Sequence, residues 1–158
     1  MPIPEFIVDL RTKVGTDLLW LTGITAVVVR ELDGIEEVLL VQRSDDLRWT
    51  PVNGIVDPGE LPQRAAVREV FEEAGLVVEI ERLVWVSVTG VVTYANGDRT
   101  QYLDHTFRCR WVEGDPVHDG DEVLSARWCR VDDLPELDTG NAERLAVALA
   151  NLPECRLD

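Results

Sequence analysis

The sequence has 158 residues, of which 46% are hydrophobic and 28% are charged. That length suits one domain with its own core, and the composition excludes a disordered tail or a collagen-like fibre. Thirty acidic residues against fifteen basic ones give a formal net charge of −15. Such a charge repels the backbone of a nucleic acid duplex and an anionic membrane surface, so neither is an expected partner.

Targeting signals and cysteine spacing indicate the compartment. No apolar run approaches the roughly 20 residues that span a bilayer, and the N-terminus lacks the pattern of a signal peptide. Cys109, Cys129 and Cys155 are odd in number and have no CxxC spacing, which indicates neither a disulfide framework nor a zinc site. We therefore expect a cytoplasmic protein in which residues 1–158 form a single domain.

Runs of apolar residues and their spacing predict the order of helices and strands. Pro4–Val14 has helical spacing and ends at Gly15. The pair Asp33-Gly34 lies between two apolar runs and predicts a hairpin. Strands are predicted at 18–21, 24–29, 38–41, 77–88, 100–111 and 123–131, and a last helix from Asp138 or Thr139 to Leu149. No regular βαβ alternation appears, which favours an α+β fold or a three-layer sandwich over a doubly wound sheet.

The segment Gly54–Leu76 reads GIVDPGELPQRAAVREVFEEAGL and predicts a Gly/Pro loop that leads into an amphipathic helix over Leu61–Ala74. Gly75 follows the helix as a C-cap. At about 100° per residue, one face of this helix is apolar. Its members are Ala66, Val67, Val70, Phe71 and Ala74.

Three carboxylates lie beside that apolar face. Glu69, Glu72 and Glu73 fall within an arc of about 100°, and Glu69 and Glu73 repel each other as an i,i+4 pair of like charge. Arg68 precedes Glu72 by four residues, so its side chain can hold that carboxylate. A cation relieves such crowding, and oxygen ligands at this density suit Mg²⁺ or Mn²⁺, which retain water and bind phosphate oxygens.

The same segment resembles the Nudix box, Gly-x5-Glu-x7-Arg-Glu-U-x-Glu-Glu-x-Gly-U with U apolar, at every specified position. The matching residues are Gly54, Glu60, Arg68, Glu69, Val70, Glu72, Glu73, Gly75 and Leu76. A chance match in a chain of this length is on the order of 10⁻⁷ from ordinary residue frequencies. The resemblance implies the Nudix fold, an α/β/α sandwich around a mixed β-sheet. One stretch departs from the family, because Pro51-Val52-Asn53-Gly54 stands where Pro-Gly-Gly is frequent.

The resemblance also implies an activity and a set of residue roles. Nudix hydrolases are metal-dependent pyrophosphohydrolases that cleave a nucleoside diphosphate linked to another moiety, and the implied cofactor here is Mg²⁺ or Mn²⁺. The implied substrate classes are nucleoside triphosphates, dinucleoside polyphosphates and nucleotide sugars. The implied metal ligands are Glu69, Glu72, Glu73 and the Gly54 carbonyl. Arg68 is implied to hold the carboxylates by charge-assisted hydrogen bonds, and Glu60 to contact the site through water or to orient the helix.

Two residues outside the box have candidate roles. The base that activates water is either a box glutamate or an acidic residue from a later loop, and Glu122 in Asp119-Gly120-Asp121-Glu122 resembles that loop position. The alternative for Glu122 is a solvated acidic turn. Arg43, at the end of a predicted strand close before the box, is a candidate phosphate contact, and its alternative is a surface ion pair.

Two other functions stay open on the sequence alone. One is a non-catalytic Nudix-like nucleotide-binding module, and the other is an isopentenyl diphosphate isomerase. Such modules usually lose box glutamates, and the isomerase depends on a reactive cysteine and a different metal cage. The present chain retains every box glutamate, which favours a hydrolase.

The N-terminal segment and the tryptophans indicate packing surfaces. Phe6, Ile7 and Leu10, together with the run Leu18–Leu21, offer more apolar surface than an N-terminal extension of residues 1–21 needs. We expect them to pack against the domain or against a symmetric partner, so a homodimer is a further expectation. The tryptophans at 20, 85, 111 and 128 alternate with apolar neighbours and are expected in the core or in an interface.

Overall fold

The computed structural model describes residues 3–158, and residues 1 and 2 of the N-terminal extension lie outside the described residues. Within residues 3–158 the chain forms three helices and one mixed sheet of eight strands. In chain order the elements are α1 (Glu5–Val14), β1 (Leu19–Leu32), β2 (Ile35–Arg43), β3 (Trp49–Thr50), β4 (Val52–Ile55), α2 (Pro62–Ala74), β5 (Val77–Val88), β6 (Val92–Thr93), β7 (Arg99–Glu113), β8 (Val123–Arg130) and α3 (Thr139–Ala150).

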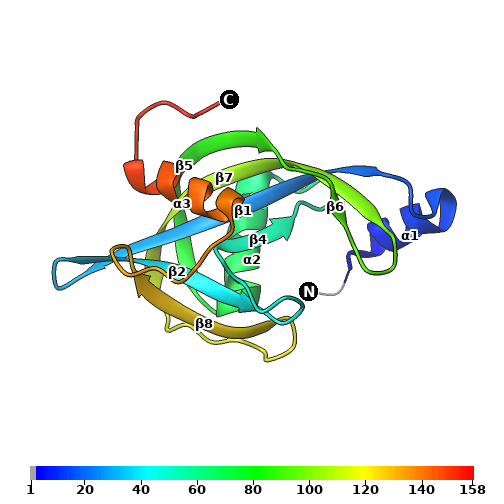
Figure 1. The fold of residues 1–158 in the computed structure, drawn as a ribbon. Coiled ribbons are helices and arrows are strands. Elements are labelled where there is room, and N and C mark those ends of the chain that lie inside the picture. The colour runs from blue at the N-terminus through cyan, green and yellow to red at the C-terminus, as the bar shows by residue number, and fades with distance from the viewer. Residues whose placement is uncertain (1–2) are drawn as a thin grey trace.

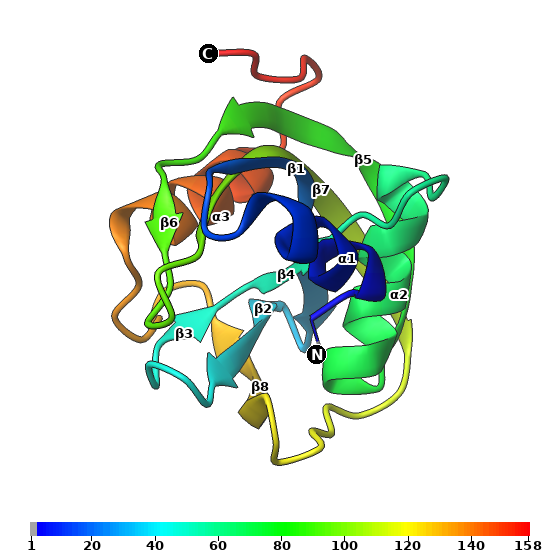
Figure 2. The same cartoon turned by 90° about the vertical axis from the view of Figure 1, so that its right-hand side faces the viewer.

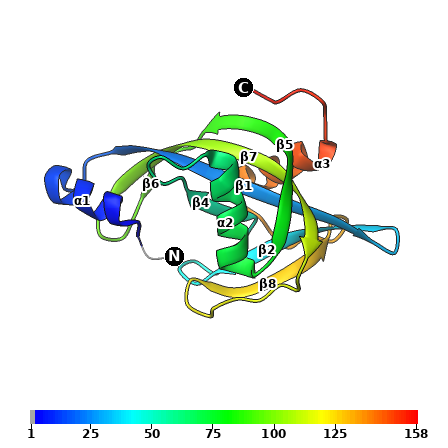
Figure 3. The same ribbon diagram turned by 180° about the vertical axis from the view of Figure 1, so that it is seen from behind.

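Two helices cover opposite faces of the sheet, so the fold has three layers. Figure 1 shows α3 on the near side of β1 and β7, and Figure 3 shows α2 on the side behind them. The main strand order is β3-β2-β1-β7-β5, while β4 pairs with β1, β6 with β7 and β8 with β2. β1 and β7 run parallel, and the other paired strands run antiparallel. This arrangement confirms the predicted α/β/α sandwich around a mixed sheet.

The central strand β1 is buried on both faces. Successive side chains of a strand point to opposite sides of the sheet, so a continuous apolar run serves two cores at once. Ile24, Ala26 and Val28 belong to the hydrophobic cluster that α2 covers. Val27 and Val29 belong to the cluster that α3 covers.

Two segments differ from their predicted secondary structure. The runs predicted as separate strands at 18–21 and 24–29 form one strand, because Thr22 and Gly23 continue the parallel ladder with β7. Residues Val52–Ile55 include the start of the predicted Gly/Pro loop, yet they pair with β1 as β4. The second difference matters for function, because it places Gly54 in a sheet rather than in a loop.

The prediction that Phe71 belongs to the buried face of α2 is wrong, since its side chain is 61% exposed. The buried residues of α2 are Ala65, Ala66, Glu69, Val70 and Ala74. On a helical wheel, the centre of this set lies roughly 80° from the centre of the predicted apolar face, on the side of the glutamates. The small alanines allow a close approach of α2 to the sheet, and that approach turns Glu69 inward and Phe71 outward.

The N-terminal helix lies at the end of the sheet where β1 begins (Figure 2). Ile7 is buried, and Arg11 ties α1 to β7 by donating to the Arg99 carbonyl at 2.8 Å. Trp85 is buried, whereas Trp20 is 57% exposed, so of the two positions predicted for Trp20, the core is excluded and an interface stays a prediction. Within residues 3–158, no helix combines the length and apolar character needed to cross a membrane.

Candidate active site

The helix α2 carries the acidic residues of the site, and the local sequence explains both of its ends. Pro62 occupies the first turn, where its missing N–H costs nothing because first-turn N–H groups have no helical partner. Gly75 ends the helix with a φ of 68°, a left-handed conformation that glycine adopts without strain. The Gly75 N–H donates to the Phe71 carbonyl and closes the last turn.

Arg68 binds three carboxylates. Its Nε and Nη2 donate to the two oxygens of Glu60, both at 2.9 Å, and its Nη1 donates to Glu69 at 2.9 Å and to Glu72 at 3.2 Å. The fork to Glu60 is the main reason that the pKa of Arg68 is raised and that of Glu60 is lowered. The predicted contact between Arg68 and Glu72 is present, and the Arg68 guanidinium group also makes a bidentate bond to Glu60.

Glu69 is fully buried between α2 and β4. Its side chain is 0% exposed, and its Oε2 has no hydrogen-bond partner among the described residues. A Cβ atom at Gly54 would overlap the Cγ and Cδ atoms of Glu69. Gly54 is therefore required for the close approach of helix and strand, and that approach brings the Glu69 carboxylate against the β4 backbone.

Burial changes the protonation of two glutamates. Desolvation raises the pKa of Glu69 to about 7, although the ion pair with Arg68 opposes the rise. Desolvation raises the pKa of Glu73 to about 8, the charge of Glu69 adds to the rise, and Arg43 opposes it. A bound cation would reverse both effects, because an opposite charge favours the ionised carboxylate.

A cavity of about 230 Å³ opens beside Glu73. Arg43 of β2, Glu73 of α2 and Glu122 just before β8 all line it, so three predicted site residues from distant parts of the chain come together. The ladder between β2 and β8 explains this, since Arg43 pairs with Val123. The other lining residues are Val41, Ser44, Asp45, Thr50, Asn53 and Val123.

Asp45 holds Arg43 at the wall of this cavity. Nε and Nη2 of Arg43 donate to the two oxygens of Asp45 at 2.9 and 2.6 Å. These bonds raise the pKa of Arg43 and lower that of Asp45. Both side chains are partly exposed, so the pair contributes little to stability. Its effect is to fix the plane of a guanidinium group close to Glu73.

The donors in this region fit a divalent cation that takes few protein ligands. Within residues 3–158, no three His, Cys, Asp or Glu side chains are grouped so that they alone could hold a metal ion. Glu72 is 48% exposed and bonded to Arg68, whereas Glu69 is fully buried and Glu73 is half-buried. Mg²⁺ characteristically takes one or two carboxylates and keeps water or substrate phosphates as its other ligands. The unpartnered oxygen of Glu69 and the raised pKa of Glu73 fit such an ion.

Sequence reasoning missed four polar residues of the cavity wall, which are Ser44, Asp45, Thr50 and Asn53. Thr50 and Asn53 lie on β3 and β4, and without those strands neither residue could be assigned to a face. Asp45 lies two residues after Arg43, in the turn that follows β2. That spacing of opposite charges was a signal for the Arg43–Asp45 pair.

Comparison with known proteins shows the family. A family model described as NUDIX domain matches residues 21–151. A putative 8-oxo-dGTP diphosphatase from Bacillus subtilis is 30% identical over 115 residues, which cover 72% of this chain and 70% of that protein. The crystal structure of a UDP-X diphosphatase has the same fold, with a TM-score of 0.70 and 21% identity over 98% of this chain and 74% of that chain. An ADP-ribose pyrophosphatase from Streptococcus suis has a TM-score of 0.67 and 27% identity over 87% of this chain and 98% of that chain.

These matches agree with the geometry of the site. The family match spans most of the chain and includes α2 with its complete Nudix box. The solved structures share the mixed sheet between helices. The chain therefore belongs to the Nudix family and is a pyrophosphohydrolase, in a family that generally uses divalent metal ions.

Proposed function

We propose that the chain hydrolyses a nucleoside diphosphate linked to another moiety, with Mg²⁺ or Mn²⁺ bound at Glu69 and Glu73. The observation that supports this most is the placement of two neighbouring desolvated glutamates: Glu69 is fully buried, and Glu73 is half-buried at the cavity that Arg43 also lines. Two carboxylates in such surroundings destabilise the fold unless a cation compensates their charge. A site of this kind is explained by a ligand that brings positive charge.

The residues of the chain have distinct roles in the proposed reaction. A bound cation supplies charge neutralisation at the pyrophosphate and lowers the pKa of a coordinated water. Glu69, Glu73 and the Gly54 carbonyl supply ligand oxygens, and Glu72 joins them from the exposed edge of α2. Arg43 binds a phosphate oxygen at the cavity wall, because its guanidinium group is already oriented by Asp45.

Glu122, Arg68 and Glu60 have further roles in the proposed reaction. Glu122 lines the same cavity as Glu73, which supports a role for its carboxylate as the base that takes a proton from the attacking water, or as a further ligand. Arg68 and Glu60 hold the carboxylate-bearing helix in register by their bidentate bond. Water then attacks phosphorus, and a nucleoside monophosphate is the diagnostic product.

The substrate classes are nucleoside triphosphates, dinucleoside polyphosphates and nucleotide sugars. The names of the similar proteins, an 8-oxo-dGTP diphosphatase, a UDP-X diphosphatase and an ADP-ribose pyrophosphatase, share a nucleoside diphosphate and differ in the attached group. The cavity of about 230 Å³ is smaller than the 300–1,000 Å³ or so typical of sites for drug-sized ligands. It therefore suits the phosphate end of such a substrate.

The domain organisation, assembly and partners of the chain are also proposed. Residues 1–158 act as one domain, and the exposed apolar side chains of the extension 1–21, Trp20 among them, form a homodimer contact. The net charge of −15 argues against a nucleic acid duplex and an anionic membrane as partners. The cytoplasmic location that the cysteine pattern indicates stays a prediction.

The test of the proposed function is hydrolysis of a substrate panel by metal-stripped protein, before and after Mg²⁺ or Mn²⁺ is restored. The panel contains dNTPs, dinucleoside polyphosphates, nucleotide sugars and ADP-ribose. We expect release of a nucleoside monophosphate only with the metal, and ¹⁸O from labelled water in a phosphate product. Full turnover after exhaustive EDTA treatment would contradict the proposal, as would the absence of turnover for the whole panel.

A further inference from the structure

We infer that a largely buried polar cluster between the sheet and α3 positions β4, and with it Gly54 and Glu69, from the face of the sheet opposite to Glu69. The cluster consists of Thr25, Asn53, Asp104, Thr106 and Arg144. The inference rests on the proposed function, because the residues that it names act on the proposed metal site through the backbone of β4.

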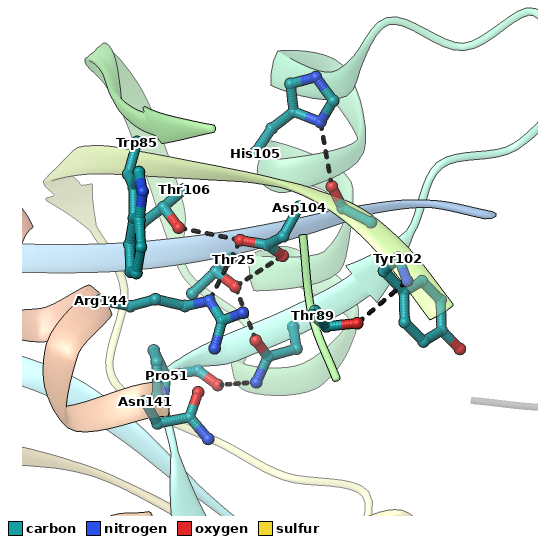
Figure 4. Close-up of polar contacts among 12 residues, drawn as sticks. Thr25, Pro51, Trp85, Thr89, Tyr102, Asp104, His105, Thr106, Asn141 and Arg144 are labelled. Carbon is teal, nitrogen blue, oxygen red and sulfur yellow. Dashed lines mark hydrogen bonds and ion pairs between the residues drawn. The ribbon is translucent and has the colours of Figure 1, made fainter. Parts of the chain in front are cut away.

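Asp104 of β7 connects the members of the cluster (Figure 4). Its Oδ1 accepts from the Thr25 hydroxyl at 3.0 Å, and its Oδ2 accepts from the Thr106 hydroxyl at 2.9 Å and from Arg144 Nε at 3.2 Å. Thr25 and Thr106 are 0% exposed and Asp104 is 5% exposed. A carboxylate buried so deeply is tolerated when it is paired and hydrogen-bonded, so each of these donors has a function in the fold.

Thr25 of β1 connects this carboxylate to β4. Its hydroxyl lies 2.8 Å from Oδ1 of Asn53, as well as 3.0 Å from Asp104. Nδ2 of Asn53 donates to the Pro51 carbonyl at 2.9 Å, and this sets the orientation of the amide because a carbonyl only accepts. A threonine has one hydroxyl hydrogen, so a single donor serves both Asn53 and Asp104.

Asn53 directly precedes Gly54 in β4, a strand of four residues that pairs with β1 alone among the described strands. Because side chains alternate along a strand, the Asn53 side chain faces Thr25 on the α3 side and Gly54 faces α2, although Asn53 also borders the cavity beside Glu73. On the α2 side, Glu69 fills the space that a Cβ of Gly54 would take. Atoms packed so closely leave no gap to absorb a shift of β4, so a shift moves Glu69 and the Gly54 carbonyl directly.

The two threonines of the cluster provide a matched pair of variants. Thr25→Val and Thr106→Val make the same chemical change at positions that are both 0% exposed, and each removes one hydroxyl donor from Asp104. Among the hydrogen bonds that the described residues of the cluster make, only that of Thr25 also reaches Asn53. The two variants therefore share the loss of a bond to Asp104 and differ in the link to β4.

The test is Mn²⁺ binding to the purified full chain, measured by electron paramagnetic resonance or calorimetry, with urea unfolding of each variant as a check. We expect Thr25→Val to weaken Mn²⁺ binding by about 10- to 100-fold, the range seen when residues behind metal ligands are replaced. Thr106→Val stays within about threefold of the parent, and Thr25→Ser, which keeps the hydroxyl, restores binding. In turnover, Thr25→Val lowers kcat and leaves the KM of the substrate near that of the parent.

Equal losses of Mn²⁺ affinity in both valine variants would overturn the inference, because a general effect of unpairing Asp104 would then explain them. An unchanged affinity in Thr25→Val would overturn it as well. If Thr25→Val does not fold, Thr25→Ala and Thr106→Ala form the substitute pair, because both remove the hydroxyl, and we expect only Thr25→Ala to lose affinity. If the parent binds Mn²⁺ but hydrolyses no substrate of the panel, the proposed function is wrong. The positioning role is then decided by the Mn²⁺ affinities of the variants alone. If the parent binds no Mn²⁺, both the proposed function and the positioning role are wrong.

Discussion

At Gly54, a hydrogen atom in place of a methyl group allows α2 to approach β4 closely enough to bury Glu69. Gly54→Ala places a Cβ on the Cγ and Cδ atoms of Glu69, so strand and helix must separate. We expect a loss of about 1–3 kcal/mol in the free energy of unfolding, as for other overpacked cores, together with loss of metal-dependent activity. Gly90→Ala is the control, because nothing lies within 4 Å of its Cβ position. Urea unfolding of both variants checks this, and parent-like stability of Gly54→Ala would contradict the close approach.

Arg68 is the only cation bonded to the buried carboxylate of Glu69 in the contacts that the described residues make. Arg68→Lys keeps the charge but cannot form the fork to Glu60, because an ammonium group lacks two parallel N–H donors. We expect a loss of about 1–3 kcal/mol in the free energy of unfolding, the usual cost of leaving a buried polar group without its partner. Arg130→Lys, at an exposed fork to Asp132, is the matched control and should unfold like the parent. Equal urea midpoints for the two variants would contradict a structural role for Arg68.

At the scale of elements, α3 depends on Asp138 as its N-cap. Burial opposes the charge of Asp138, but hydrogen bonds from the backbone and side-chain N–H groups of Asn141 outweigh it and lower the pKa. A lowered pKa means that the stabilisation is fully present above the ordinary value of about 4 and is lost as the pH falls through the folded-state value. Asp138→Ala should therefore cost about 1 kcal/mol at neutral pH and less in strong acid. Urea unfolding of parent and variant across this pH range tests the sign, and a deficit that grows in acid would contradict it.

The helix α2 could be predicted from its sequence, whereas its rotation and the strand before it could not. The helical period, Pro62 and Gly75 are local signals that mark its span. β4 has four residues, one of them glycine, and it is a strand because it pairs with β1, which lies far away in sequence. The predicted apolar face included Phe71 because it was assigned from the hydrophobicity of the side chains. Hydrophobicity alone does not predict a site in which Glu69 is buried.

At the scale of the whole molecule, the site is assembled by the sheet. The box residues were readable because they are contiguous on one helix, and Arg43 and Glu122 were identified from their places near the box and in an acidic loop. Both residues line one cavity because β2 pairs with β8, and no local pattern in the sequence predicts that pairing. The link from Thr25 to Asp104 spans 79 residues, so its polar members carried no signal in the sequence.

The proposed homodimer is also a property of the whole molecule. Trp20 is 57% exposed near α1, and a second copy would bury it. Because each copy carries a net charge of −15, association should strengthen as salt screens the repulsion. Light scattering across a range of protein and salt concentrations should show the dimer mass, and Trp20→Ser should shift the mass towards the monomer. A monomer mass under all of these conditions would contradict the dimer.

If hydrolysis requires a cation held by Glu69 and Glu73, kcat/KM of Glu73→Gln tests that requirement most directly. Gln keeps the size of Glu73, and because the raised pKa of Glu73 reports that burial disfavours its charge, folding should survive or improve. With one substrate at saturating Mg²⁺, we expect kcat/KM to fall by at least about 100-fold, the scale on which loss of a key electrostatic group is felt. Glu122→Gln, measured beside it, loses as much only if Glu122 is the base or a ligand. A Glu73→Gln enzyme within about threefold of the parent would contradict the assignment of Glu73 as a metal ligand, whatever Glu122→Gln does.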